Sequence, residues 1–247
     1  MLAMSTQRDP THIVRKGPTL RRLRELYRLD QVAEAEAMVE DVLRLFPRTD
    51  AAASALLTRG MQRRFRGDDP GALRDFEMAA DSSTNRDART AAFKAGSVAQ
   101  ILEDDATAKR MYLKVATKWP GTVLAAVSAG AVADMDHDCP DYWRKIRLDT
   151  IEALAARPVK GSRDDLWALL ELVEHFWDDK AHPARSPAKA AAYARELLRR
   201  ATARGEAEYA RQADVALIAI ETGRRTTAVE VLLTMGRDPR ATARTLE

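Results

Sequence analysis

The sequence predicts an all-α protein. Alanine is abundant, apolar residues recur at helical spacing, and runs of alternating Val, Ile and Thr are absent. No Asn-Gly or Asp-Gly dipeptide stands between apolar runs, so the usual signals of β-hairpins are missing. The chain has 247 residues, of which 46% are apolar and 31% are charged. This length and this charge favour a continuous array of helices with a large surface over a compact α/β enzyme.

The N-terminal part of the chain predicts a leader followed by a first pair of helices. Residues 1–16 are polar, contain Pro10 and have no helical period, so we expect a flexible leader. Gly17-Pro18-Thr19 then opens a helix, because proline is tolerated in a first helical turn. Asp30 is expected to begin the partner helix, and Phe46-Pro47 to end it. The expected buried positions are Leu20, Leu23, Leu26, Tyr27, Ala35, Val39 and Val42.

A second pair follows, with stronger boundary signals. Asp50 is the predicted N-cap of its first helix. The turn at residues 67–70 (Gly-Asp-Asp-Pro) combines a helix breaker with a carboxylate N-cap and a proline at the start of the next helix. The predicted register of the pair is Leu56, Gly60 and Arg63, followed by Ala72, Phe76 and Ala79.

The third pair, at residues 89–122, is the most regular. Small residues follow one face of its first helix, and they let two helix backbones approach closely: Ala92, Ala95, Gly96 and Ala99. After an acidic turn at residues 103–105, the second helix carries Ala108, Tyr112 and Val115, and Pro120 ends it. We expect Tyr112 to close the far end of the contact between the two helices.

Three anchor positions recur at a common offset of 36 residues: Gly60 and Gly96, Ala72 and Ala108, Phe76 and Tyr112. Gly96, Ala108, Tyr112 and Pro120, at spacings of twelve, four and eight, resemble the tetratricopeptide repeat (TPR). The resemblance covers residues 17–122 well, 206–236 moderately and 122–204 only in the layout of helix pairs. It implies a right-handed α-solenoid of five or six stacked antiparallel helix pairs, in which each pair buries its apolar face against the next. A compact all-α bundle is the alternative, which the recurrence disfavours.

The C-terminal half continues with less regular pairs. Residues 122–134 and 140–156 predict one pair, and residues 157–161 are the clearest break in the chain. We therefore divide the chain into the leader (1–16), N-terminal TPR-like repeats (17–158) and C-terminal helix pairs that continue the array (159–247). Ser162 and Asp165 are spaced like a capping box. An amphipathic stripe follows at Leu166, Leu169, Leu170, Val173, Phe176 and Trp177.

The remaining C-terminal segments are also predicted to be helical. A loop at residues 178–186 precedes a helix that begins at Pro187 and ends near Ala203. Residues 206–222 and 226–235 form the last predicted pair, which turns around Gly223. Asp238-Pro239 is the predicted start of a short helix that closes the array.

Composition and charge narrow the class of protein. The chain has a single cysteine, Cys139, so an intrachain disulfide is impossible. No apolar run approaches the length of a transmembrane helix, and the first residues lack the apolar core of a secretory signal, so we expect a cytoplasmic protein. The net charge is +3, yet residues 1–66 carry 13 basic and 8 acidic residues, residues 67–180 carry 15 and 21, and residues 181–247 carry 12 and 8. This basic–acidic–basic order could steer charged partners, although ordinary solvated helix faces explain it as well.

Residues 134–141 gather the one candidate metal cluster, with His137, Cys139 and several aspartates. A metal site needs three or four converging ligands, and a loop of solvated carboxylates accounts for this segment equally well. Cys139 has no recognisable nucleophile context, the four histidines share no motif, and no glycine-rich phosphate loop is present. We therefore predict a protein that is not an enzyme and that has no cofactor and no metal.

The resemblance implies a binding face. In the TPR family, the first helix of each pair lines a concave groove that takes extended peptides or helices. The corresponding residues here are Arg21, Arg24 and Arg28 in the first pair, Leu57, Met61 and Arg64 in the second, and Phe93, Ser97 and Gln100 in the third. The expected function is that of an adaptor or scaffold that binds an acidic protein segment, with Met61 and Phe93 accepting an apolar anchor. Leu57 and Phe93 could instead belong to the core between repeats.

Other surfaces offer competing hypotheses. Trp167 lies off its helix stripe on the side of Glu171 and Glu174, where it could receive a cationic side chain or pack on the next helix pair. Four arginines surround Phe65 and could contact phosphates, so a nucleic-acid-binding regulator is the competing function: Arg59, Arg63, Arg64 and Arg66. A helical interaction domain of a larger enzyme or sensor is the third possibility.

Overall fold

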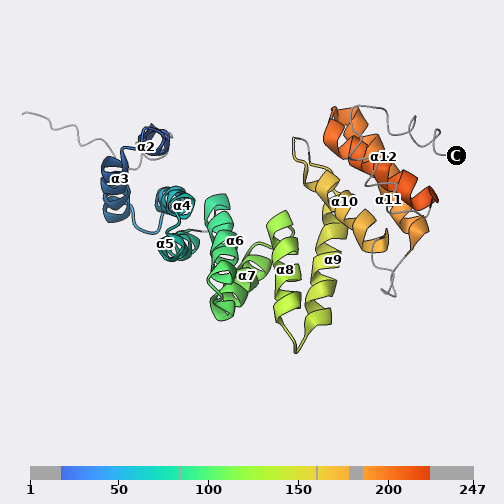
Figure 1. Ribbon diagram of the computed structural model, residues 1–247, viewed down its shortest axis with the longest axis horizontal. Helices are drawn as coiled ribbons and strands as arrows, with labels where there is room; N and C mark the ends of the chain where they lie inside the picture. The colour runs from blue at the N-terminus through green and yellow to red at the C-terminus, as the bar shows by residue number, and fades with distance from the viewer. Residues whose placement is uncertain (1–17, 84, 160, 178–185, 223–247) are drawn as a thin grey trace, which may run out of the picture. The chain divides into compact units, whose positions relative to one another are not determined.

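The computed structural model describes residues 18–83, 85–159, 161–177 and 186–222, and within them the protein is all-α (Figure 1). These residues form eleven helices and no strand, which confirms the predicted all-α class. The helices are α2 (Pro18–Arg28), α3 (Val32–Leu45), α4 (Asp50–Phe65), α5 (Asp69–Ser82), α6 (Arg86–Ile101), α7 (Asp105–Lys118), α8 (Val123–Met135), α9 (Pro140–Ala156), α10 (Asp164–Trp177), α11 (Pro187–Arg204) and α12 (Ala207–Thr222). The predicted leader, the helix at 226–235, its turn at Gly223 and the closing helix lie outside the described residues.

The chain forms two compact units, and their division falls within α8 and α9. The first unit holds α2 to α7 together with residues 127–144, and the second holds residues 121–126 and the chain from Lys145 onward. The predicted boundary at residue 158 separates regular from less regular repeats, which is a different criterion from the division into compact units. It therefore stays a prediction. None of the described helices has both the length and the apolar composition that a membrane span requires.

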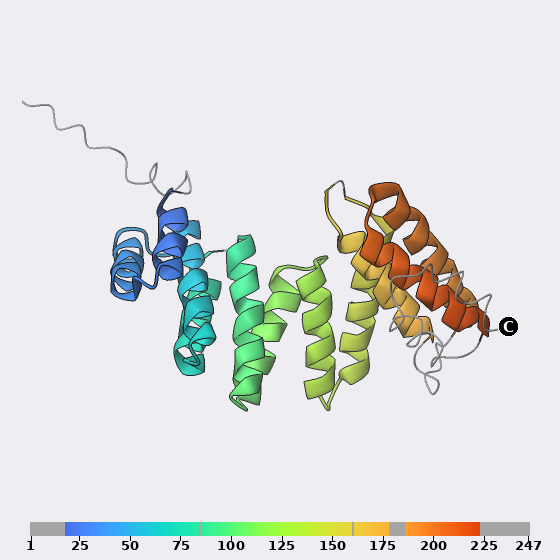
Figure 2. The ribbon, with the colours of Figure 1, turned by 45° about the horizontal axis from the view of Figure 1, so that its top comes forward.

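In the first unit, each helix from α2 to α6 packs against the next one in the sequence (Figure 2). The first helices of successive pairs also touch, since α2 contacts α4 and α4 contacts α6. Three clusters of buried residues fill the spaces between these helices, around Leu26, Phe76 and Tyr112 respectively. This order of contacts is consistent with stacked helical hairpins.

The two glycine anchors lie directly against the two aromatic anchors. A Cβ atom added to Gly60 would stand 2.6 Å from Cε1 of Phe76, and one added to Gly96 would stand 2.8 Å from Cε1 of Tyr112. Phe76 is fully buried and Tyr112 is 3% exposed. The predicted close approach of the two helices is therefore confirmed in the second and third pairs, because only a residue without a side chain leaves room for the ring.

The three turns within the pairs share one backbone geometry. Asp30, Gly67 and Glu103 are left-handed, with φ of 56°, 82° and 58°. In each turn the next residue donates its N–H to a carbonyl five positions back, at 2.9 Å, which is a Schellman motif. The prediction that Asp30 begins α3 is wrong, because Asp30 belongs to the turn that ends α2. Helix α3 begins at Val32, after Gln31.

The helix starts confirm one predicted cap and correct another. Asp68 accepts the N–H of Gly71 at 2.9 Å, as a carboxylate N-cap should. The predicted cap at Asp50 is wrong, because Thr49 occupies that position and its Oγ1 accepts the N–H of Ala52 at 3.3 Å. Asp50 is the first helical residue, and its carboxylate accepts a hydrogen bond from the hydroxyl of Ser83 at 2.7 Å.

In the second unit, α10 packs against α11, α11 against α12, and α10 also contacts α12. The predicted stripe of α10 faces the core: Leu166, Leu169, Val173 and Phe176 are buried, and Leu170 and Trp177 are half-buried. The predicted capping box between Ser162 and Asp165 does not form, because α10 begins only at Asp164. Ser162 accepts the N–H of Asp164 at 3.1 Å, but Asp165 is buried and binds Arg204 at 2.8 Å and Arg200 at 3.1 Å. The Asp165 carboxylate, which the sequence predicts to cap α10, instead pairs with Arg200 and Arg204 of α11.

Candidate protein-binding face

The candidate site is the set of positions on α2, α4 and α6 that the resemblance predicts to line a groove, called here the first-helix face. Arg21, Arg24 and Arg28 are exposed on α2, and Arg28 forms an ion pair with Glu25 at 2.6 Å. Met61 lies on α4 and is 43% exposed. A thioether at this degree of exposure offers an adaptable apolar contact, so Met61 keeps the position expected of an anchor site.

Leu57 and Phe93 pack against buried residues of the first unit. Leu57 is half-buried and packs on the cluster that surrounds Phe76. Phe93 is also half-buried, and its ring centroid lies 5.7 Å from that of Tyr112. Both side chains therefore contribute to packing between helices, and only their outer edges are open to a partner.

Ser97 and Gln100 lie next to the anchor Tyr112. Ser97 is half-buried on α6, and Gln100 is exposed. The Tyr112 hydroxyl donates a hydrogen bond to Oε1 of Gln100 at 2.8 Å. The amide nitrogen of Gln100 is left as its donor toward solvent, so this residue orients the tyrosine and borders the face at the same time.

Arg64 and Lys94 are two half-buried cations on neighbouring helices of the face. Neither has a carboxylate within ion-pair distance among the residues that the structure describes. Burial lowers the pKa of Lys94, and the positive charge of Arg64 lowers it further. The sequence predicted Arg64 but not Lys94; a lysine two residues before the glycine anchor Gly96 was the available signal.

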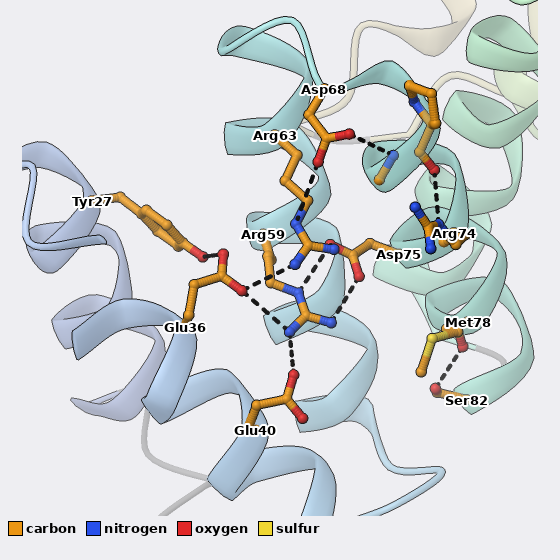
Figure 3. Close-up of polar contacts among 12 residues, drawn as sticks. Tyr27, Glu36, Glu40, Arg59, Arg63, Asp68, Arg74, Asp75, Met78 and Ser82 are labelled. Carbon is orange, nitrogen blue, oxygen red and sulfur yellow. Dashed lines mark hydrogen bonds and ion pairs between the residues drawn. The ribbon is translucent and has the colours of Figure 1, made fainter. Parts of the chain in front are cut away.

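The other side of α4 carries a buried ion network (Figure 3). Arg59 is 5% exposed and donates two hydrogen bonds to Asp75, at 2.9 and 2.8 Å. Arg63 lies 3.1 Å from the same carboxylate and 3.1 Å from Glu36, which also accepts the Tyr27 hydroxyl at 3.2 Å. Burial raises the pKa of Asp75, and the two guanidinium groups oppose that shift. Burial, followed by the charge of Glu36, raises the pKa of Tyr27.

This network was not predicted, although the repeat contains a signal for it. At the offset of 36 residues, Arg59, Arg63 and Asp75 correspond to Ala95, Ala99 and Met111. Those three residues of the third pair are completely buried. A buried charge is costly unless it is paired, so charged residues at three core positions of one repeat are expected to pair with one another.

The network bears on the nucleic-acid hypothesis. Arg59 and Arg63 bind carboxylates, and Arg66 pairs with Asp30 at 2.9 Å while lying 5.9 Å from the centroid of the Tyr27 ring. A phosphate would have to displace these internal partners at three of the four arginines. Phe65, which is 87% exposed, is the one feature of this cluster that favours stacking on a base.

Trp167 belongs to the second unit. Its indole is half-buried and packs on the cluster around Leu166 and Leu172. Glu171, one of the two carboxylates expected beside it, forms an ion pair with Arg147 of α9. A cationic partner at Trp167 would therefore compete with an internal arginine.

The candidate metal cluster is taken up by structural contacts. Asp136 pairs with Lys109 at 3.2 Å and accepts the indole N–H of Trp143 at 3.1 Å. His137 and Cys139 are exposed. In the part of the chain that the structure describes, no three His, Cys, Asp or Glu side chains are grouped so that they could hold a metal ion.

Comparison with known proteins found no matching family model and no matching curated protein. What the fold defines is therefore a class: an all-helical protein whose described helices pack in sequential, neighbouring pairs.

Proposed function

We propose that this protein is a non-catalytic, TPR-like adaptor that binds an acidic protein segment across its first-helix face. In this proposal the helix pairs form a right-handed solenoid, and Met61 accepts an apolar side chain of the segment. One observation carries the proposal: Arg64 and Lys94 are brought together on α4 and α6 without a carboxylate of their own.

Arg64 differs in this respect from the neighbouring arginines of α4 and its C-cap. Arg59, Arg63 and Arg66 each pair with a carboxylate of the same unit. Two adjacent cations that are half removed from water repel each other, and an incoming carboxylate would relieve that repulsion. Binding an acidic segment would therefore raise the pKa of Lys94 toward its ordinary value.

The test is partner capture from a native lysate, with and without nuclease, by wild type and by the double variant Arg64→Glu/Lys94→Glu. The matched control is Arg144→Glu/Lys145→Glu, because these residues of α9 are exposed and the change in charge is the same. We expect wild type and the control variant to capture the same partner proteins, and Arg64→Glu/Lys94→Glu to lose them. Retention of the same partners by wild type and both double variants contradicts the proposal, and recovery of nucleic acid alone supports the nucleic-acid-binding regulator.

A further inference from the structure

A hollow of about 290 Å³ lies in the first unit, beside the turn that joins the first helix pair to the second. Its floor is apolar, since Ala52 and Leu56 are each 1% exposed, and Met78 stands at its rim, 50% exposed. Leu43 of α3 and Asp81 of α5 complete the opposing walls. Ligand pockets begin near roughly 300 Å³, so the hollow suits one large side chain better than a whole small molecule.

Two successive interfaces between second helices differ, and the hollow lies at the first of them. Between α5 and α7, Glu77 pairs with Arg110 at 2.5 Å and Asp81 pairs with Lys114. At the repeat offset of 36 residues, Met78 corresponds to Lys114. The first and second pairs are 37 residues apart, as Ala35 and Ala72 show, and at that spacing Arg44 of α3 corresponds to Asp81. Arg44 pairs with Asp41 of its own helix at 2.7 Å. Among the described residues no ion pair joins α3 to α5, and an exposed methionine stands where the next interface has a bridging lysine.

Arg48 lies at the edge of the hollow in a conformation that arginine rarely adopts. Its φ is 57°, whereas the matching turn before α8 has Gly121 with φ of 72°. The two turns are otherwise alike: Phe46 and Trp119 have φ of −135° and −128°, and Thr49 and Thr122 cap the helices that follow. A left-handed arginine costs conformational free energy that glycine avoids. Arg48 is exposed and has no carboxylate within ion-pair distance in the part of the chain described.

We propose that this hollow is a second protein-docking site, which takes a bulky apolar side chain of a partner segment whose neighbouring carboxylate pairs with Arg48. Charge complementarity identifies the partner: Asp81 is already neutralised by Lys114, so the cation of Arg48 is the open charge at the edge. The site shares no residue with the first-helix face and does not depend on the function proposed for that face.

The test uses protein labelled with ¹³C at the methionine methyl groups, with the Met78 signal assigned through Met78→Leu. The probes are three capped dipeptides: acetyl-Glu-Phe-amide, acetyl-Lys-Phe-amide and acetyl-Glu-Ala-amide. We expect a saturable shift of the Met78 methyl with Glu-Phe and none with Glu-Ala. Exchanging Glu for Lys in the probe, or Arg48→Gly in the protein, should weaken binding about two- to fivefold, the range of one exposed ion pair.

A second variant closes the hollow. Arg44→Asp/Met78→Lys installs the residues of the α5–α7 interface and should abolish binding, read from the amide signal of Ser82. The matched control is Ile101→Lys, because Ile101 and Met78 are 52% and 50% exposed; it should leave the Met78 shift intact. A Met78 methyl that does not move, or that moves equally with Glu-Ala or in Arg48→Gly, overturns the proposal. The Met61 methyl reports the first-helix face separately, so the failure of one site is distinguishable from that of the other.

Discussion

At the scale of the residue, Gly60 and Gly96 decide how closely the two helices of a pair approach. Each leaves the space into which an aromatic ring of the partner helix fits. A glycine in the middle of a helix is otherwise unfavourable, costing about 0.5–1 kcal/mol relative to alanine. The ring contact is the compensation, because it buries Phe76 and Tyr112 almost completely.

Gly60→Ala should therefore destabilise the first unit by about 1–3 kcal/mol, the cost of overpacking, although alanine is the better helix former. Urea unfolding followed by circular dichroism measures the change. The double variant Gly60→Ala/Phe76→Leu should recover part of the loss, since leucine leaves space for the added methyl group. A stabilised Gly60→Ala variant would mean that the ring does not contact this glycine.

At the scale of the element, α4 is joined to its neighbours by charge as well as by apolar packing. Arg59 and Arg63 reach Asp75 on α5, while Arg63 also reaches Glu36 on α3. Buried ion pairs contribute little net stability compared with well-packed apolar residues, but removing one partner leaves an uncompensated charge. The network thus favours one packing arrangement of α3, α4 and α5 over others.

Asp75→Leu and Arg59→Leu should each lower the free energy of unfolding, toward the lower end of about 3–5 kcal/mol, because Arg63 and Glu40 remain as alternative partners. The double variant Arg59→Leu/Asp75→Leu should cost clearly less than the sum of the two. A double-mutant cycle in urea measures this coupling, for which about 0.5–3 kcal/mol is usual between contacting residues. Additive losses would show that the pair is not coupled.

At the scale of the whole molecule, the uneven distribution of charge along the chain is expected to affect the rate at which partners associate. Residues 1–66 carry an excess of basic residues, 13 against 8 acidic ones. Four arginines are exposed on α2, and three of them belong to the proposed face: Arg21, Arg24 and Arg28. Exposed charges at the edge of an interface act mainly on the rate of encounter.

Arg24→Glu/Arg28→Glu should slow association with a captured acidic partner and reverse part of its salt dependence. Met61→Ala should instead raise the dissociation rate, at about 1–3 kcal/mol if Met61 is a hot spot. Surface-immobilised partner and stopped-flow kinetics separate the two rates. Thermal unfolding should change by less than about 0.5 kcal/mol for the arginine pair. If both variants bind like wild type, the partner does not use the first-helix face.

The sequence by itself determined the helices, most of their ends and the pairing of neighbours in the first unit. These features depend on local spacing: Gly60 and Phe76, sixteen residues apart, meet because a tight turn folds one helix back on the other. The left-handed Gly67 and the cap at Asp68 were readable for the same reason. Exposed Met61 and half-buried Arg64 follow from the same helical register.

Only the tertiary structure decided which charges meet. Arg59 has partners on two other helices, Asp165 is claimed by Arg200 and Arg204 in place of the cap, and Lys94 comes to lie beside Arg64. The hollow beside Arg48 likewise lies between α3 and α5, two helices that are not adjacent in sequence and that no ion pair joins among the described residues. Long charged side chains can turn to several neighbours, so their partners depend on the stacking of successive pairs, whereas a glycine and a ring within one hairpin have a single way to fit.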